Sequence, residues 1–79
     1  MIDLRVRTVI SEQLGVDLDE VTTDAMLGEQ LGADSLDAIE LTLALEDAFA
    51  IEIPDEDAQR LLRVSDVIAY VQQRAGAGV

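Results

Sequence analysis

Ser35 is the side chain in this sequence that is best placed to do chemistry. It lies in the run Leu31–Asp37, where a glycine-containing loop leads into a predicted amphipathic helix. A serine nucleophile needs a neighbouring base, and the chain has no histidine and no lysine. Two other roles stay open. Ser35 caps the helix, or its hydroxyl holds a phosphodiester, an anion that the positive end of a helix stabilises.

The composition argues against several classes of function. Without cysteine the chain has no disulfide and no thiolate metal site, and without histidine it lacks the commonest general base and zinc ligand. Its 79 residues suffice for one small domain, and the formal net charge of −12 disfavours nucleic acid and favours basic protein surfaces. The first residues resemble neither a signal peptide nor a membrane span, so we expect a cytoplasmic protein.

The hydrophobic pattern predicts an all-α domain, because aliphatic residues repeat at helical spacing and no segment alternates like a strand. We expect a small four-helix bundle with three principal helices, a short third helix and a long loop between the first two. The predicted helices cover residues 2–14, 35–50, 55–61 and 64–74, and the loop covers residues 16–33. Residues 1–75 form the expected domain, and residues 76–79 form a frayed tail.

Capping residues and apolar spacing define these helices. Gly15 is expected to end the first helix, and Asp34 or Ser35 to cap the second, where Asp34 and Asp37 have capping-box spacing. The expected core face of the second helix comprises Ala38, Leu41, Leu45, Ala48 and Phe49. The core positions expected elsewhere are Ile2, Val6, Val9, Ile10 and Leu14, then Val21, Met26, Leu27 and Leu31 in the loop, and Val64, Val67, Ile68 and Val71 with Tyr70 near the edge.

The second helix has a further apolar set on nearly the opposite side, formed by Leu36, Ile39 and Leu43. Acidic residues lie between them, namely Glu40, Glu46 and Asp47. One interpretation is that another layer of protein covers this side. The other is a docking surface, in which the aliphatic side chains are buried by a partner and the acids select a basic one.

The segment Leu31–Leu41, which reads LGADSLDAIEL, resembles the phosphopantetheine attachment motif of the acyl carrier proteins. Its Asp-Ser-Leu centre is Asp34, Ser35 and Leu36. The chain is similar throughout to the freestanding bacterial proteins of type II fatty-acid synthesis. The further similar segments are Glu12–Val16 (EQLGV), Ala44–Asp47 (ALED) with Phe49, Ile51–Ala58 (IEIPDEDA) and Asp66–Tyr70.

This resemblance implies a carrier that is not an enzyme. A phosphopantetheinyl transferase would attach 4'-phosphopantetheine from coenzyme A to Ser35, and the thiol of the arm would hold acyl groups as thioesters for fatty-acid synthesis enzymes with basic docking patches. The implied docking residues are Asp34, Leu36, Asp37, Ile39, Glu40, Leu43, Glu46 and Asp47. The implied acyl-chain cavity comprises Val6, Leu27, Leu45, Ile53, Ala58, Leu61 and Val67, for which ordinary core packing is the alternative.

The chain departs from the family pattern at two places. Arg63, which follows Leu62, stands where the family commonly has a threonine just before the last helix, so Ser65 or Asp66 must cap that helix. Leu62 either adds exposed apolar surface or deepens the core. Thr42 and Leu43 replace a more common apolar pair on the second helix, which leaves the partner preference open.

Other functions remain as alternatives to the fatty-acid carrier. One is a freestanding carrier for polyketide or specialised-lipid synthesis, and another is an acidic adaptor that only docks proteins. A peptidyl or D-alanyl carrier is disfavoured by the residues before Ser35. The acidic residues 55–57 and 17–24 have oxygen ligands for a divalent cation, but we interpret them as solvated charges and expect no metal site. We expect a monomer without a nucleic-acid partner or a membrane span.

Overall fold

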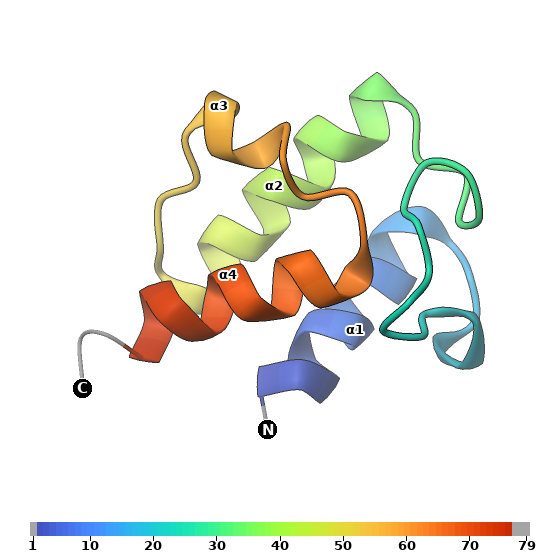
Figure 1. Ribbon diagram of the computed structural model, residues 1–79, viewed down its shortest axis with the longest axis horizontal. Helices are drawn as coiled ribbons and strands as arrows, with labels where there is room; N and C mark the ends of the chain where they lie inside the picture. The colour runs from blue at the N-terminus through green and yellow to red at the C-terminus, as the bar shows by residue number, and fades with distance from the viewer. Residues whose placement is uncertain (1, 77–79) are drawn as a thin grey trace.

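The computed structural model describes residues 2–76 and has the predicted all-α architecture (Figure 1). Within these residues no strand forms, and the only β-type pairing is an isolated bridge between Met26 and Arg63. The four helices and the long first loop are therefore confirmed. The elements in chain order are α1 (Ile2–Leu14), the short 3-10 helix η1 (Leu18–Glu20), α2 (Ser35–Phe49), α3 (Asp55–Ala58) and α4 (Val64–Gly76).

The core is aliphatic and is centred on α1, which packs against both α2 and α4 (Figure 1). Val6 and Ile10 are the fully buried residues of α1, and the predicted Ile2, Val9 and Leu14 are partly buried around them. In α4, all four predicted core positions are buried, and Tyr70 lies half-buried at the edge. Burial of each such aliphatic side chain contributes about 1.5–3 kcal/mol, so the packing of α1 against α2 and α4 is a major source of stability.

Helix α2 has a narrower core face than the sequence predicts. Leu41 and Leu45 are buried and Phe49 is half-buried, but Ala38 and Ala48 are exposed, so the prediction was wrong for both alanines. Ala38 lies near the start of α2 and borders open pockets rather than another helix. Ala48 lies in the last turn of α2. Both alanines lie at the margin of the core face, where a methyl side chain is too short to reach the neighbouring helices.

Helix α3 is also shorter than predicted, since it ends at Ala58 rather than at about Leu61. The amide of Gln59 still donates to the carbonyl of Asp55, four residues back, at 3.1 Å. The next amides, of Arg60 and Leu61, donate to carbonyls only three residues back. The backbone therefore tightens into 3-10-type turns, which do not continue an α-helix.

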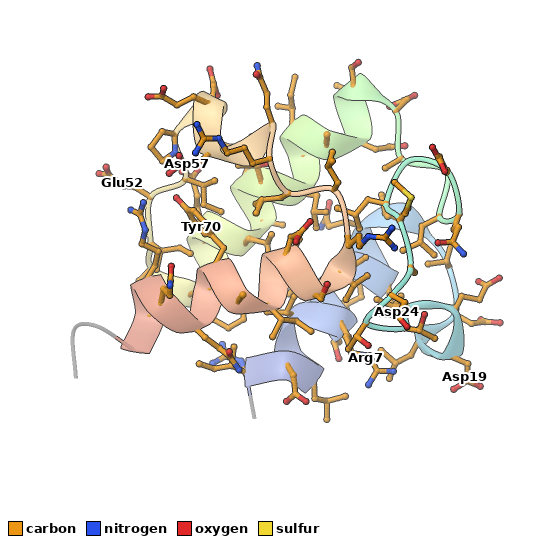
Figure 2. All side chains as sticks on the ribbon, viewed as in Figure 1. Arg7, Asp19, Asp24, Glu52, Asp57 and Tyr70 are labelled. Atoms are coloured by element: carbon orange, nitrogen blue, oxygen red, sulfur yellow. The ribbon has the colours of Figure 1, made fainter. Side chains whose placement is uncertain are left out.

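The loop between α1 and α2 is fastened to the core, as the sequence predicts. Gly15 ends α1 with a φ of 67°, a conformation that glycine adopts without strain. Arg7 on α1 donates from Nε to the Val21 carbonyl at 2.7 Å, and Figure 2 shows its side chain beside the loop. Of the predicted loop contacts, three are buried and Met26 is partly buried. The buried loop residues are Val21, Ala25, Leu27 and Leu31, of which Ala25 was not predicted.

The start of α4 is capped by Asp66, one of the two residues proposed from the sequence. Its Oδ2 accepts hydrogen bonds from the amides of Leu62 at 3.2 Å and Arg63 at 3.0 Å. The Leu62 side chain is exposed, which decides between the two expectations for it. Helix α4 extends through Gly76, beyond the predicted end at Arg74, and residues 77–79 of the expected tail lie outside the described residues. No helix within residues 2–76 is long and apolar enough to cross a membrane.

Candidate functional site

Ser35 is the first residue of α2 and is exposed. The residue that caps α2 is Asp34: its Oδ1 accepts from the Asp37 amide at 2.8 Å, while Asp37 Oδ2 accepts from the Asp34 amide at 3.2 Å. The predicted capping box is confirmed, and Ser35 takes no part in it. Within residues 2–76 the Ser35 hydroxyl has no hydrogen-bond partner, so it is neither used by the fold nor activated by a base.

The backbone around Ser35 leaves two hydrogen-bond donors open. The first four amides of a helix lack intrahelical acceptors, and in α2 the capping box satisfies those of Asp34 and Asp37. The amides of Ser35 and Leu36 remain without an acceptor among the described residues. A phosphate on Ser35 Oγ would therefore meet free N–H groups and the positive end of the helix dipole, so the site fits a phosphodiester.

Ser65 provides a contrast, because it is also an exposed serine in the first turn of a helix. Asp66 occupies the amides of Leu62 and Arg63, as described above. The amide of Val64 donates to the Ala25 carbonyl at 3.0 Å, and that of Ser65 donates to the Thr23 carbonyl at 2.9 Å. The amide of Asp66 itself donates to the Arg63 carbonyl at 3.1 Å. The four leading amides of α4, those of Arg63, Val64, Ser65 and Asp66, therefore all have protein acceptors, unlike those of α2.

The second apolar set of α2 is open to solvent. The exposed fractions of Leu36, Ile39 and Leu43 are 63%, 58% and 58%. No layer of the described protein covers them, so the interpretation of a covered face was wrong. These three residues, with Ser35 at one end of the helix, form a face that we call the α2 apolar face.

The acidic residues predicted for docking divide into two groups. Asp34 and Asp37 are engaged in the capping box, and Glu46 Oε2 accepts a hydrogen bond from the Ile53 amide at 2.7 Å. Glu40 and Asp47 are exposed and make no hydrogen bond or ion pair with the described residues. These two carboxylates are consequently the ones free to meet a partner.

A groove of about 530 Å³ lies between α2 and the α3 segment and has Ser35 on its rim. Its α2 side runs from Ser35 to Glu46, about 16 Å at 1.5 Å per residue. A second pocket, of about 350 Å³, lies beside the groove and reaches the buried Leu45. The two spaces share Ala38, Thr42, Ala58 and Gln59 as lining residues.

The residues predicted to form an acyl-chain cavity lie partly along these spaces. Five line the second pocket, Ile53 lines the groove, and Val6 lines neither and is fully buried in the core. The predicted cavity residues did not include Ala38, Thr42 and Gln59, which line both spaces. Thr42 offered a signal, since it is a polar residue on an otherwise apolar stretch of helix. The five predicted residues in the second pocket are Leu27, Leu45, Ala58, Leu61 and Val67.

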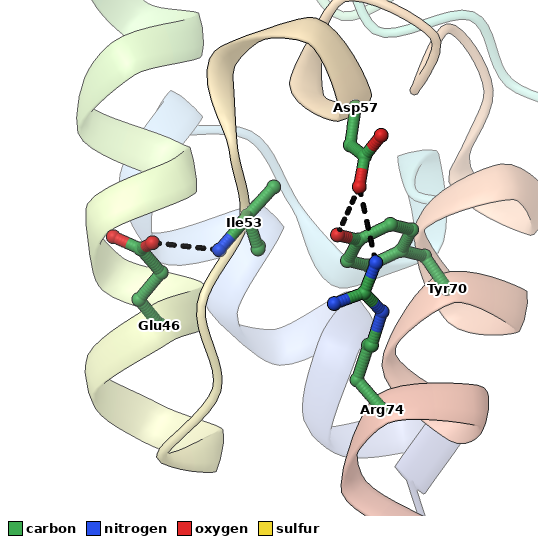
Figure 3. A network of polar contacts seen from close by, with 5 residues as sticks. All are labelled: Glu46, Ile53, Asp57, Tyr70 and Arg74. Atoms are coloured by element: carbon green, nitrogen blue, oxygen red, sulfur yellow. Dashed lines mark hydrogen bonds and ion pairs between the residues drawn. The ribbon is translucent and has the colours of Figure 1, made fainter.

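The acidic residues considered for a cation do not gather into a site. Within residues 2–76 no group of three or more potential ligands lies close enough to hold a metal ion. Among residues 55–57, Asp57 is instead hydrogen-bonded to α4. Its Oδ2 accepts from Tyr70 Oη at 2.8 Å and from Arg74 Nη2 at 3.1 Å (Figure 3).

Tyr70 has an altered acidity as a result of this contact. Desolvation of the phenol raises the pKa of Tyr70 above its ordinary value of 10.0, and the hydrogen bond to Asp57 raises this pKa further. The positive charge of Arg74 opposes the rise. The phenol is therefore a stable hydrogen-bond donor at neutral pH. One part of this contact could be predicted from the sequence, namely that Tyr70 and Arg74, four residues apart, lie on one face of the helix.

Comparisons with known proteins agree with this geometry. Residues 4–71 match the family model described as the phosphopantetheine attachment site. Over 75 residues the chain is 52% identical to a protein named acyl carrier protein from Akkermansia muciniphila, covering 95% of this chain and 94% of that protein. The resemblance predicted from the sequence is thereby confirmed, and the chain belongs to the acyl carrier proteins, the family defined by a phosphopantetheine attachment site.

Proposed function

We propose that Ser35 is the attachment point for 4'-phosphopantetheine and that this protein carries acyl groups for fatty-acid biosynthesis. The observation that supports this site most strongly is the pair of open amides beside an exposed hydroxyl at the rim of a groove. Ser35 Oγ forms the phosphodiester, the amides of Ser35 and Leu36 are placed to donate to it, and the fold is left intact. The arm supplies a terminal thiol on which acyl groups are held as thioesters.

The role is that of a carrier rather than a catalyst. Coenzyme A and a phosphopantetheinyl transferase supply the arm, and separate enzymes supply the chemistry on the acyl group. The proposal places the protein in the cytoplasm as a monomer of one domain, residues 1–75, which contains the matched residues 4–71. The net charge of −12 supports the monomer, because like-charged copies repel one another.

The test of attachment is the intact mass of the unmodified protein after incubation with coenzyme A, magnesium and a broad-specificity phosphopantetheinyl transferase. We expect the mass to rise by one phosphopantetheine, since one serine has both an exposed hydroxyl and open amides. An unchanged mass, or the addition of two arms, would contradict the proposal.

The α2 apolar face is the proposed docking surface for the transferase and for the fatty-acid synthesis enzymes. Exposed aliphatic side chains provide burial, and Glu40 and Asp47 attract basic residues on the partner. Asp34, Asp37 and Glu46, which the resemblance also assigns to docking, would act through the charge that remains on their outward oxygens. The groove between α2 and α3 is the proposed shelter for the acyl chain, because it begins at Ser35 and is bordered by aliphatic residues.

Glu40→Lys is expected to weaken binding to a partner enzyme about tenfold at low salt, since the exposed charge changes from attractive to repulsive. The effect should shrink as salt screens the interaction. Affinity measured at several salt concentrations tests this, with helical content by circular dichroism unchanged.

Glu12→Lys is the matched control for Glu40→Lys, because Glu12 is exposed on α1 and the change in net charge is the same. We expect this control to alter the affinity much less. Equal losses for the two variants would mean that net charge, rather than the α2 apolar face, determines binding.

A further inference from the structure

Helix α3 forms one wall of the groove, yet burial contributes little to holding it. None of its four residues is fully buried, and Ala58 alone among them borders both pockets. A wall with so little buried apolar surface gains little from the hydrophobic effect. Ala58 is the α3 residue that packs against the core, so polar contacts to the neighbouring helices contribute much of what holds the rest of α3 in place.

The segment that leads into α3 is fixed to α2. Glu46 Oε2 accepts the Ile53 amide at 2.7 Å, and the Ile53 side chain is buried in the core. Figure 3 shows this contact on the α2 side of the segment. The chain is consequently anchored just before α3 begins, and motion of α3 would pivot about this point.

The far side of α3 is fixed to α4 through a single oxygen atom. Asp57 Oδ2 accepts both the Tyr70 hydroxyl at 2.8 Å and the Arg74 guanidinium at 3.1 Å, and that guanidinium lies 4.8 Å from the centre of the Tyr70 ring (Figure 3). Hydrogen bonds to an ionised carboxylate are stronger than neutral ones. Asp57, Tyr70 and Arg74, which we call the α3 latch, line neither pocket.

We propose that the α3 latch holds α3 against the bundle and so determines how long an acyl chain stays in the groove. The latch residues are positioning residues, because they act on the wall of the groove without touching its contents. This inference rests on the proposed function, in which the groove shelters the chain. When the latch opens, α3 pivots about Ile53 and the thioester is exposed to solvent and to attacking reagents.

Asp57→Asn and Tyr70→Phe test the latch in the unmodified protein. Hydrogen exchange at the amides of Ala58 and Gln59, which form the α3 backbone bonds, should quicken roughly tenfold in Asp57→Asn and roughly threefold in Tyr70→Phe. Exchange in α1 should not change. Tyr70→Phe removes one hydroxyl and keeps the ring beneath Arg74, so it is expected to fold even if Asp57→Asn does not.

Glu56→Gln is the matched control, since Glu56 is exposed on the same helix, is not part of the latch, and loses the same charge as Asp57→Asn. It should leave the exchange rates unchanged. If these amides exchange as slowly in Asp57→Asn and Tyr70→Phe as in Glu56→Gln, the latch proposal is wrong. This result does not depend on whether Ser35 carries an arm.

The tyrosinate absorbance gives a direct signature of the contact, because the chain has one tyrosine and no tryptophan. Asp57→Asn should lower the pKa of Tyr70 relative to the parent protein, since the variant removes the negative charge that raises this pKa and leaves only a neutral acceptor for the phenol, while Arg74 and Glu46 remain nearby. A pKa unchanged by the substitution would show that Asp57 does not contact the phenol.

The second experiment measures acyl retention on the loaded protein. Octanoyl and acetyl thioesters are challenged with hydroxylamine, and the octanoyl thioester should be cleaved several-fold faster in Tyr70→Phe than in the parent, at about the scale of one lost hydrogen bond. The acetyl thioester, too short to enter the groove, should show no difference. Faster α3 exchange with unchanged octanoyl cleavage would overturn the latch while leaving attachment at Ser35 intact. If the protein instead takes up no phosphopantetheine arm, the proposed function is overturned, and so is the proposal that the latch controls acyl retention.

Discussion

Ser35→Ala is expected to abolish the mass gain from coenzyme A and the transferase completely. The substitution removes the only oxygen to which the phosphodiester is proposed to bind, so the loss should be total rather than partial. The fold should survive, because Ser35 is exposed, makes no side-chain hydrogen bond within the described residues, and is not the cap of α2. Alanine is also a favourable helix residue. Intact mass reports the loss, and circular dichroism reports the fold.

Ser65→Ala is the matched control for this prediction. Ser65 is likewise exposed in the first turn of a helix, but every leading amide of α4 already has an acceptor. We expect this variant to gain one arm as readily as the parent. A mass gain that persists in Ser35→Ala and disappears in Ser65→Ala would place the attachment on α4 and would contradict the assignment of Ser35.

Local sequence signals were enough to predict most of the fold. Aliphatic spacing located α1 and α4, and Gly15 marked the end of α1 because its positive φ is costly for other residues. The spacing of Asp34 and Asp37 predicted the capping box. It left open whether Asp34 or Ser35 is the cap, because both residue types cap helices.

The errors and omissions concern contacts between segments that are distant in sequence. The length of α3 depends on where its hydrogen bonds shorten, and the exposure of Ala38 depends on a pocket bounded by other elements. The α3 latch joins Asp57 to Tyr70 and Arg74 on α4. Only the four-residue spacing of Tyr70 and Arg74 was visible in the sequence, and nothing local identified the carboxylate that they share.

Ile10→Ala is expected to cost about 2–5 kcal/mol of unfolding free energy, the range for truncating a large buried aliphatic residue. The side chain is 0% exposed on α1, the helix that contacts both α2 and α4. Ile10 borders neither pocket, so the truncation would leave an enclosed cavity in the core. At about 0.05–0.15 kcal/mol per residue, a domain of this length has roughly 4–12 kcal/mol in total. Urea unfolding followed by circular dichroism should therefore show a greatly lowered midpoint.

Ile39→Ala makes the same chemical change on the α2 apolar face, where the side chain is 58% exposed. Its effect should stay within about 0.5 kcal/mol, because most of the lost surface already faces water and alanine favours the helix. The docking proposal adds a second expectation, since Ile39→Ala should weaken partner binding while Ile10→Ala should weaken folding. Comparable losses of stability in the two variants would mean that Ile39 is packed against protein. The α2 apolar face would then be part of the core and could not serve as a docking surface beside Ser35.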